Sequence, residues 1–77
     1  MGYTKHRIDD SPGNIINAIS LITGFKAYRN REILVSRYVE GHTHEEIAEI
    51  FDMSPRQIKK ICYDYEPFII DHLRVGE

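Results

Sequence analysis

THEEIAEIFDMSPRQ, residues 43–57, contains two helix starts in close succession. Thr43 followed by Glu46 forms a capping box, in which the threonine side chain accepts the Glu46 N–H and the glutamate accepts the Thr43 N–H. Ser54 and Pro55 begin the second helix, because serine caps free N–H groups and proline is tolerated in the first turn. The stretch therefore predicts two short helices joined by a tight turn.

The turn itself, residues 52–54, is so short that the helices must meet at a sharp angle. Ala48 offers a small side chain where the second helix crosses the first. Asp52 occupies a turn position that often needs a positive φ, which aspartate tolerates better than most residues. The side chains expected to face inward are Ile47, Ala48, Phe51, Met53, Ile58 and Ile61. The pattern predicts a helix-turn-helix over residues 43–65.

Further helices are expected on both sides of this unit. Ser11-Pro12 starts one that Gly24 can end, and Asn30 caps another that ends at Gly41. Pro67 disfavours helical geometry in the residue before it, so the recognition helix is expected to span 55–65 and a separate short helix to span 67–75. No strand alternation or hairpin turn is present. We predict a single all-α domain over 1–77 with four to five short helices and a flexible N-terminal arm, residues 1–10.

Composition narrows the class of protein. The chain has 77 residues, of which 42% are hydrophobic and 29% charged, which is typical of a compact fold and not of a disordered chain. Its apolar runs are too short to cross a membrane. One cysteine, Cys62, rules out an internal disulfide and is typical of a cytoplasmic protein, which is the location we expect.

The outward face of the predicted second helix suits recognition of DNA. Arginine and lysine can donate to guanine, and glutamine can pair with adenine in the major groove. The net charge of −2 is unusual for such a protein, so local basic faces must supply the attraction. The candidate DNA-binding residues are Ser54, Pro55, Arg56, Gln57, Lys59, Lys60 and Tyr63.

Residues 30–65 resemble region 4 of bacterial RNA polymerase sigma factors and the small regulators built on that module. The resemblance is carried by Arg31-Glu32-Ile33-Leu34, Arg37-Tyr38-Val39-Glu40-Gly41, Thr43, Glu45-Glu46-Ile47-Ala48-Glu49-Ile50-Phe51, Met53-Ser54 and Ile58. It implies a helix-turn-helix in the major groove, contact with RNA polymerase, and base-facing Ser54, Arg56, Gln57, Lys59 and Lys60. Asp52 departs from the family's usual turn glycine, and Tyr63 and Asp64 stand where basic residues often continue. A free-standing regulator from a phage or mobile element fits this size.

Several other features have two interpretations. Lys5 and Arg7 could enter a minor groove as a basic arm, although a disordered terminus is more common. The apolar side chains of residues 68–75 could cap the core or form the seam of a homodimer. His42 and His44 lack a second ligand pair at zinc spacing, so we expect no metal and no cofactor. No catalytic arrangement stands out, and we expect the chain not to be an enzyme.

The sequence thus favours a sequence-specific regulator that binds double-stranded DNA, in transcription or in recombination, through helix 55–65. The alternative is a protein-interaction module that docks on RNA polymerase or another regulator and makes little contact with DNA. Its motivation is the acidic stretch 40–52, which contains no lysine or arginine.

Overall fold

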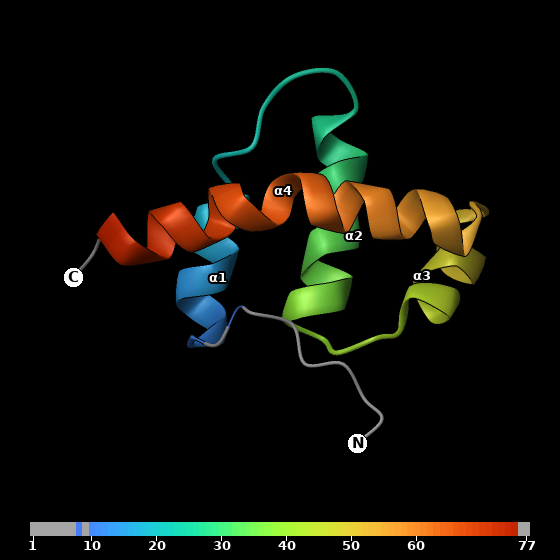
Figure 1. Ribbon diagram of the computed structural model, residues 1–77, viewed down its shortest axis with the longest axis horizontal. Helices are drawn as coiled ribbons and strands as arrows, with labels where there is room; N and C mark the ends of the chain where they lie inside the picture. Colours follow the sequence, from blue (N-terminus) through green and yellow to red (C-terminus); the bar gives the residue numbers. More distant parts are fainter. Residues whose placement is uncertain (1–7, 9, 76–77) are drawn as a thin grey trace.

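A computed structural model describes residue 8 and residues 10–75, with side chains to Leu73. Four helices make up this part of the chain, and it contains no strand, so the predicted all-α class is confirmed. The helices are α1 (Pro12–Ile19), α2 (Ala27–Tyr38), α3 (His44–Phe51) and α4 (Pro55–Val75). In Figure 1, α4 runs across α1 and α2, and α3 lies beneath its N-terminal end.

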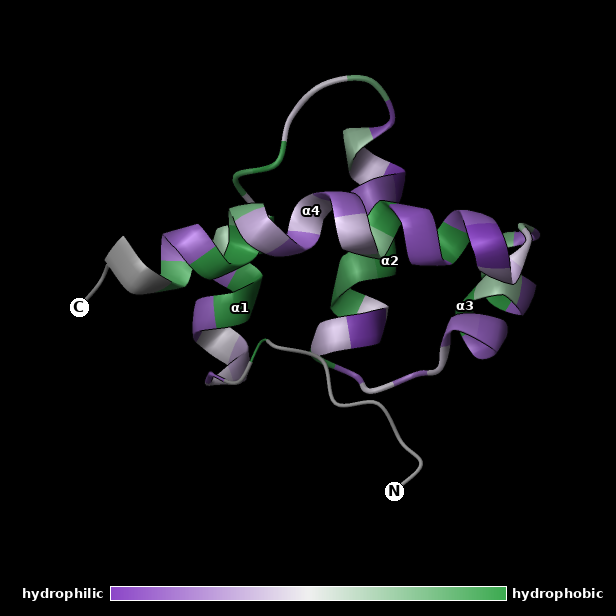
Figure 2. Cartoon of the chain, viewed as in Figure 1, coloured by the Kyte–Doolittle hydropathy of each residue, from purple (hydrophilic) through white to green (hydrophobic). Residues whose placement is uncertain are grey.

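One core joins all four helices. α4 packs against each of the other three, and α2 packs against α1 and α3. Figure 2 shows apolar segments along α1 and α2 and at intervals along α4. The core is built mainly of isoleucine, with Ile8 entering it from before α1. Its buried apolar residues are Ile8, Ile15, Ala18, Ile19, Ile22, Ala27, Ile33, Leu34, Tyr38, Ile47, Ala48, Ile58, Cys62 and Ile69.

α1 starts at the predicted cap but ends earlier than predicted. The Ser11 side chain accepts the Asn14 N–H at 3.4 Å. The helix stops at Ile19, where the backbone tightens: the Ile22 N–H donates to the Ile19 carbonyl, three residues back. This tightening brings Ile22 into the core at 2% exposure. Gly24 has a φ of +108° in the loop that follows, so it is not the residue that ends the helix.

α2 begins at Ala27, three residues before the predicted cap. Lys26 stands at the N-cap in a left-handed conformation, with no side-chain hydrogen bond to the helix. Asn30 lies inside the helix and is buried, and its side-chain oxygen accepts from the Arg29 guanidinium at 3.2 Å. Burial of Ala27 explains the early start, because packing of the first turn replaces a polar cap.

α4 is one helix of 21 residues, so the predicted break before Pro67 and the separate helix over 67–75 are wrong. Pro67 has no N–H to give to the carbonyl four residues earlier, and a proline inside a helix is costly. Packing on both sides of it offsets that cost. Glu66 accepts a hydrogen bond from the Tyr38 hydroxyl at 3.2 Å, and Ile69 is fully buried, while Pro67 itself is exposed.

The same packing bears on one of the two interpretations of the C-terminal apolar residues. Ile69 belongs to the buried core, and Phe68, Ile70 and Leu73 pack against it. These side chains therefore cap the core, as the first interpretation holds, and a homodimer through residues 68–75 stays a prediction.

Candidate nucleic-acid interface

The predicted capping box at the start of α3 is present. The Glu46 N–H donates to Thr43 Oγ1 at 3.1 Å, and the Thr43 N–H donates to Glu46 Oε1 at 2.9 Å. These bonds, together with the backbone N–H of His42 to the carbonyl of Ser36 at 3.0 Å, hold the linker that leads into α3. The backbone N–H of Thr43, and after it the His42 side chain, lowers the pKa of the Glu46 carboxyl group.

The turn after α3 has the geometry of a Schellman motif. Asp52 is left-handed, with φ 57° and ψ 47°, as its place in the turn predicted. The Met53 N–H reaches the Ala48 carbonyl at 2.9 Å, and the Asp52 N–H reaches the Glu49 carbonyl at 3.4 Å. The two bonds turn the chain sharply, so that α4 starts immediately above α3.

Close packing fixes the angle between α3 and α4. Ile47 and Ile58 are fully buried, and Ala48 between the helices is 4% exposed. Phe51, Met53 and Ile61 are partly buried against this centre. All six predicted inward positions therefore face the core or its boundary, which gives α4 a rigid platform.

A second capping box starts α4. The Gln57 N–H donates to Ser54 Oγ at 3.2 Å, and Gln57 Oε1 accepts from the Ser54 N–H at 3.0 Å and from the Ser54 hydroxyl at 3.2 Å. The amide oxygen of Gln57 is thus used inside the protein. An adenine reader needs both a donor and an acceptor, so Gln57 in this rotamer lacks the acceptor that its predicted role requires.

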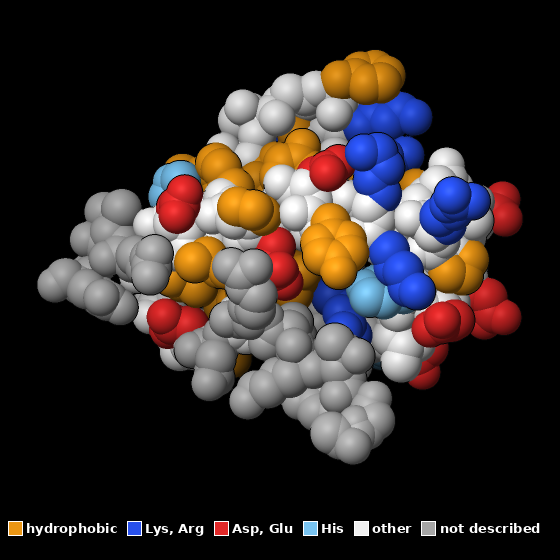
Figure 3. Space-filling model, in the orientation of Figure 1, with side chains coloured by type: hydrophobic (Ala, Val, Ile, Leu, Met, Phe, Trp, Pro, Cys, Tyr) orange, Lys and Arg blue, Asp and Glu red, His pale blue; other side chains and the backbone are white. Residues whose placement is uncertain are grey.

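The remaining predicted residues lie on the outward face of α4. Pro55, Arg56, Lys59 and Lys60 are exposed, and the Tyr63 side chain is 75% exposed. Lys60 also forms an exposed ion pair with Asp64 at 3.3 Å. Figure 3 shows that lysine and arginine side chains gather over this end of the molecule, with acidic side chains along its lower rim. The local basic face that the net charge required is therefore present.

A further basic group, which the sequence did not indicate, lies beside this face. The positive charges of Arg37 on α2 and Lys59 on α4 act on the imidazole ring of His44. Partial burial, followed by these two charges, lowers the pKa of His44, and Glu45 acts weakly the other way. Arg37 donates from Nη1 to the His42 carbonyl at 3.0 Å, which fixes its position. Arg37 and Lys59 are far apart in the sequence and lie on different helices, so periodicity within one helix could not reveal this basic group.

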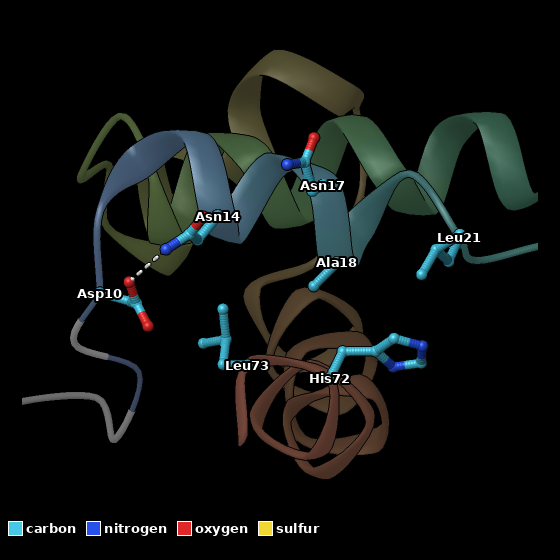
Figure 4. A pocket seen from close by; sticks show the side chains of 7 residues that line it. All are labelled: Asp10, Asn14, Asn17, Ala18, Leu21, His72 and Leu73. Carbon is cyan, nitrogen blue, oxygen red and sulfur yellow. Dashed lines mark hydrogen bonds between the residues drawn. The ribbon is translucent and has the colours of Figure 1, made fainter. Parts of the chain in front are cut away.

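Two hollows lie elsewhere on the described surface. One, of about 380 Å³, lies between the start of α1 and the end of α4, and Figure 4 shows the Asp10–Asn14 hydrogen bond of 2.9 Å at its edge. The other is an apolar groove of about 450 Å³ between α1 and α2, bordered by Ile16, Tyr28 and Val35. Neither touches the outward face of α4, so neither belongs to the candidate interface.

The described part of the chain has no group of three or more histidine, cysteine or acidic side chains that could hold a metal ion. None of its helices is long and apolar enough to cross a membrane. The predicted arm residues, Lys5 and Arg7, lie outside the described residues.

Residues 28–61 match the family model for sigma-70, region 4. The match covers most of α2, all of α3 and the first turns of α4, and it supports the resemblance that the sequence carries. No curated protein and no solved structure gives a significant match to the chain.

Proposed function

Since α3 and α4 form a helix-turn-helix of the sigma-70 region 4 type, we propose that this chain is a regulator that binds double-stranded DNA with sequence preference. The first three turns of α4 would lie in the major groove, and α3 would cross the backbone above it. The observation that carries the proposal is the outward basic face of α4: three cationic side chains on a rigid, capped helix start, with no part of the described chain covering them.

The contacts that these residues make within the protein support a different proposed role for each of them. Arg56 and Lys59 are the strongest candidates for donors to guanine O6 and N7, because neither is paired with a carboxylate in the described part of the chain. Lys60 must give up its partner Asp64 to reach a base or a phosphate. Tyr63, one turn later, can meet a thymine methyl group or the sugar edge. Ser54 and Gln57 act mainly by setting the start of the helix.

Electrostatics sets how this binding responds to salt. Each phosphate neutralised by a lysine or arginine contributes about −0.9 to the slope of log K against log salt. Three neutralised phosphates would give a slope of about −3, which is modest. A chain with a net charge of −2 gains no attraction from its overall field, so these local contacts alone should set how the affinity depends on salt.

The test is selection of bound sequences from a random duplex pool, followed by titration of the enriched duplex at several salt concentrations. We expect Arg56→Ala and Lys59→Ala to weaken binding and to relax the preference for bases. Lys26→Ala is the matched control, because it removes one positive charge from the loop before α2. Enrichment of no sequence, or equal loss of affinity in all three variants, would contradict the proposal.

A protein-interaction module is the second candidate, and one observation favours it. Exposed apolar side chains border the groove between α1 and α2: Ile16 is 43% exposed and Tyr28 is 71% exposed. Such a groove is a suitable seat for an apolar segment of RNA polymerase or of another regulator. The test is binding of the wild-type chain and of Tyr28→Glu to purified RNA polymerase. Binding by the wild type but not by the variant, together with no shift of any duplex, would favour this candidate over DNA binding.

The biological process is also part of the proposal. Control of transcription is the role that the sigma region 4 module supports best. An accessory role in recombination is the other process open to a small DNA-binding chain. The place where the selected sequence occurs in the genome would separate the two processes, since a promoter element indicates transcription and an attachment site indicates recombination.

A further inference from the structure

The hollow between the start of α1 and the end of α4 has the size of a site for a small molecule. Its volume of about 380 Å³ lies within the range of about 300–1,000 Å³ that is usual for such sites. Side chains from the residues before α1, from α1 itself and from the last turns of α4 line it. A ligand seated there would contact both helices at once, on a part of the surface that the proposed DNA contacts do not use.

The middle of this pocket is apolar. Ala18 on α1 is 4% exposed, and Leu73 on α4 packs against the core. In Figure 4, these two side chains lie between Asp10 at one end of the pocket and His72 at the other. A ligand that spans the pocket therefore needs an aliphatic middle section, because methylene groups gain free energy when they leave water for such a surface.

Asp10 supplies a negative charge at one end of the pocket. Its Oδ1 atom accepts the Ser11 N–H at 2.7 Å and the side-chain amide of Asn14 at 2.9 Å. These bonds, with the one from Asn14 the stronger, lower the pKa of Asp10, so the carboxylate is charged at neutral pH. Among the described side chains, no lysine or arginine forms an ion pair with Asp10. Its charge is therefore left for a cation from outside.

His72 supplies a hydrogen-bond acceptor at the other end. Its Nδ1 atom lies 3.2 Å from the Phe68 carbonyl oxygen, and the two rings of these residues are in contact, with 4.5 Å between their centroids. A carbonyl oxygen only accepts, so Nδ1 carries the proton of the neutral ring and Nε2 keeps its lone pair. Both ends of the pocket thus offer acceptors, and the ligand must bring the donors.

We propose that this pocket binds a linear aliphatic diamine in its protonated form. One ammonium group donates to Asp10 Oδ2, the methylene chain lies over Ala18 and Leu73, and the other ammonium group donates to His72 Nε2. An ammonium group has three donors and no acceptor, which suits both ends. The proposal does not depend on DNA binding, because the pocket lies away from the outward face of the first turns of α4.

The first test compares three ligands of similar length on the wild-type chain. NMR spectra of the isotope-labelled protein are recorded during titration with putrescine, butylamine and butanediol. Putrescine should give saturable shifts in the amide signals at the start of α1 and the end of α4. Butylamine, which lacks the second ammonium group, should bind several-fold more weakly. Butanediol, which has no charge, should bind about tenfold more weakly or worse. No binding of putrescine, or equal binding of butanediol, would overturn the proposal.

The second test removes the charge at the carboxylate end. Asp10→Asn keeps the Oδ1 acceptor for Ser11 and Asn14, and its affinity for putrescine should fall by about tenfold or more. Glu49→Gln is the matched control, because it removes one exposed carboxylate from α3, away from the pocket, and it should bind putrescine as the wild type does.

Equal losses in Asp10→Asn and Glu49→Gln would overturn the proposal, since they would show only a general attraction of cations to an acidic protein. Shifts spread over the acidic side chains of α3 without saturation would overturn it in the same way. Thermal unfolding checks that each variant is folded. If Asp10→Asn fails to fold, the comparison of the three ligands on the wild-type chain still decides.

Discussion

Replacement of Asp52 tests the geometry of the turn directly. Its φ of 57° and ψ of 47° are those of an ideal left-handed residue. A residue with a Cβ and no polar side chain pays about 1–2 kcal/mol for this conformation, whereas asparagine and aspartate adopt it more readily. Asp52 also places a negative charge at the C-terminal end of α3, where the helix dipole disfavours it by about 0.3–1 kcal/mol.

These two effects predict opposite outcomes for two similar variants. Asp52→Asn keeps the tolerance for a positive φ and removes the unfavourable charge, so it should stabilise the protein by roughly 0.3–1 kcal/mol. Asp52→Ala removes the charge as well but meets the full steric cost, so it should destabilise the protein by about 0.5–1 kcal/mol. In a domain of this size, 1 kcal/mol shifts Tm by about 4–8 °C. The difference between the two variants should therefore be several degrees.

Thermal unfolding followed by circular dichroism, at low salt and at high salt, provides the measurement. The gain in Asp52→Asn should shrink at high salt, because salt screens the interaction of the charge with the helix dipole. A lower Tm for Asp52→Asn than for wild type would refute the reasoning about charge. An equal or higher Tm for Asp52→Ala would refute the left-handed turn, and with it the angle at which α4 leaves α3.

Four further predictions concern the rest of the fold. Pro67→Ala should raise stability by about 1–3 kcal/mol, measured by urea unfolding, because it restores a helical hydrogen bond inside α4; no gain would mean that α4 is broken there. Ala48→Leu should cost about 1–3 kcal/mol and weaken DNA binding, because it forces α3 and α4 apart, whereas Glu49→Leu on the exposed side of α3 should do neither. Burial raises the pKa of the Cys62 thiol to about 11, so a thiol reagent at neutral pH should label the native protein only as fast as the protein opens, and rapid labelling would place Cys62 at the surface. The folded-state pKa of Glu46 is lowered, so its capping bond should stabilise the protein above the ordinary glutamate pKa and lose that effect as the pH falls through the folded value; Glu46→Gln, which keeps the cap without titrating, should lack this part of the acid transition in a pH-dependent melt.

Local hydrogen-bonding rules predicted the helix-turn-helix well. The box at Thr43 and the cap at Ser54 depend on side chains that reach only three residues along the chain, so sequence spacing is enough to find them. The left-handed Asp52 is predictable for the same reason, because a turn this short leaves few conformations open. The small Ala48 is predictable from the close crossing that the turn imposes.

Features that depend on tertiary contacts were not predictable in this way. The continuity of α4 through Pro67 rests on two contacts. Tyr38, far away in the sequence on α2, donates a hydrogen bond to Glu66, and Ile69, which follows the proline, is buried in the core. The start of α2 at Ala27 rests on burial and has no polar cap to announce it. The basic group around His44 combines three helices, so it appears only once those helices are placed.

The unbroken α4 has a consequence for how this chain can change over evolutionary time. Inserting one residue between Lys60 and Ile69 would rotate the helix beyond it by about 100° relative to its beginning. The side chains that now fill the space above α1 would swing toward water, while the basic beginning stayed in place on α3. Length variation within α4 should therefore be strongly selected against, and natural diversity should collect in the loop between α1 and α2, where extra residues disturb no register.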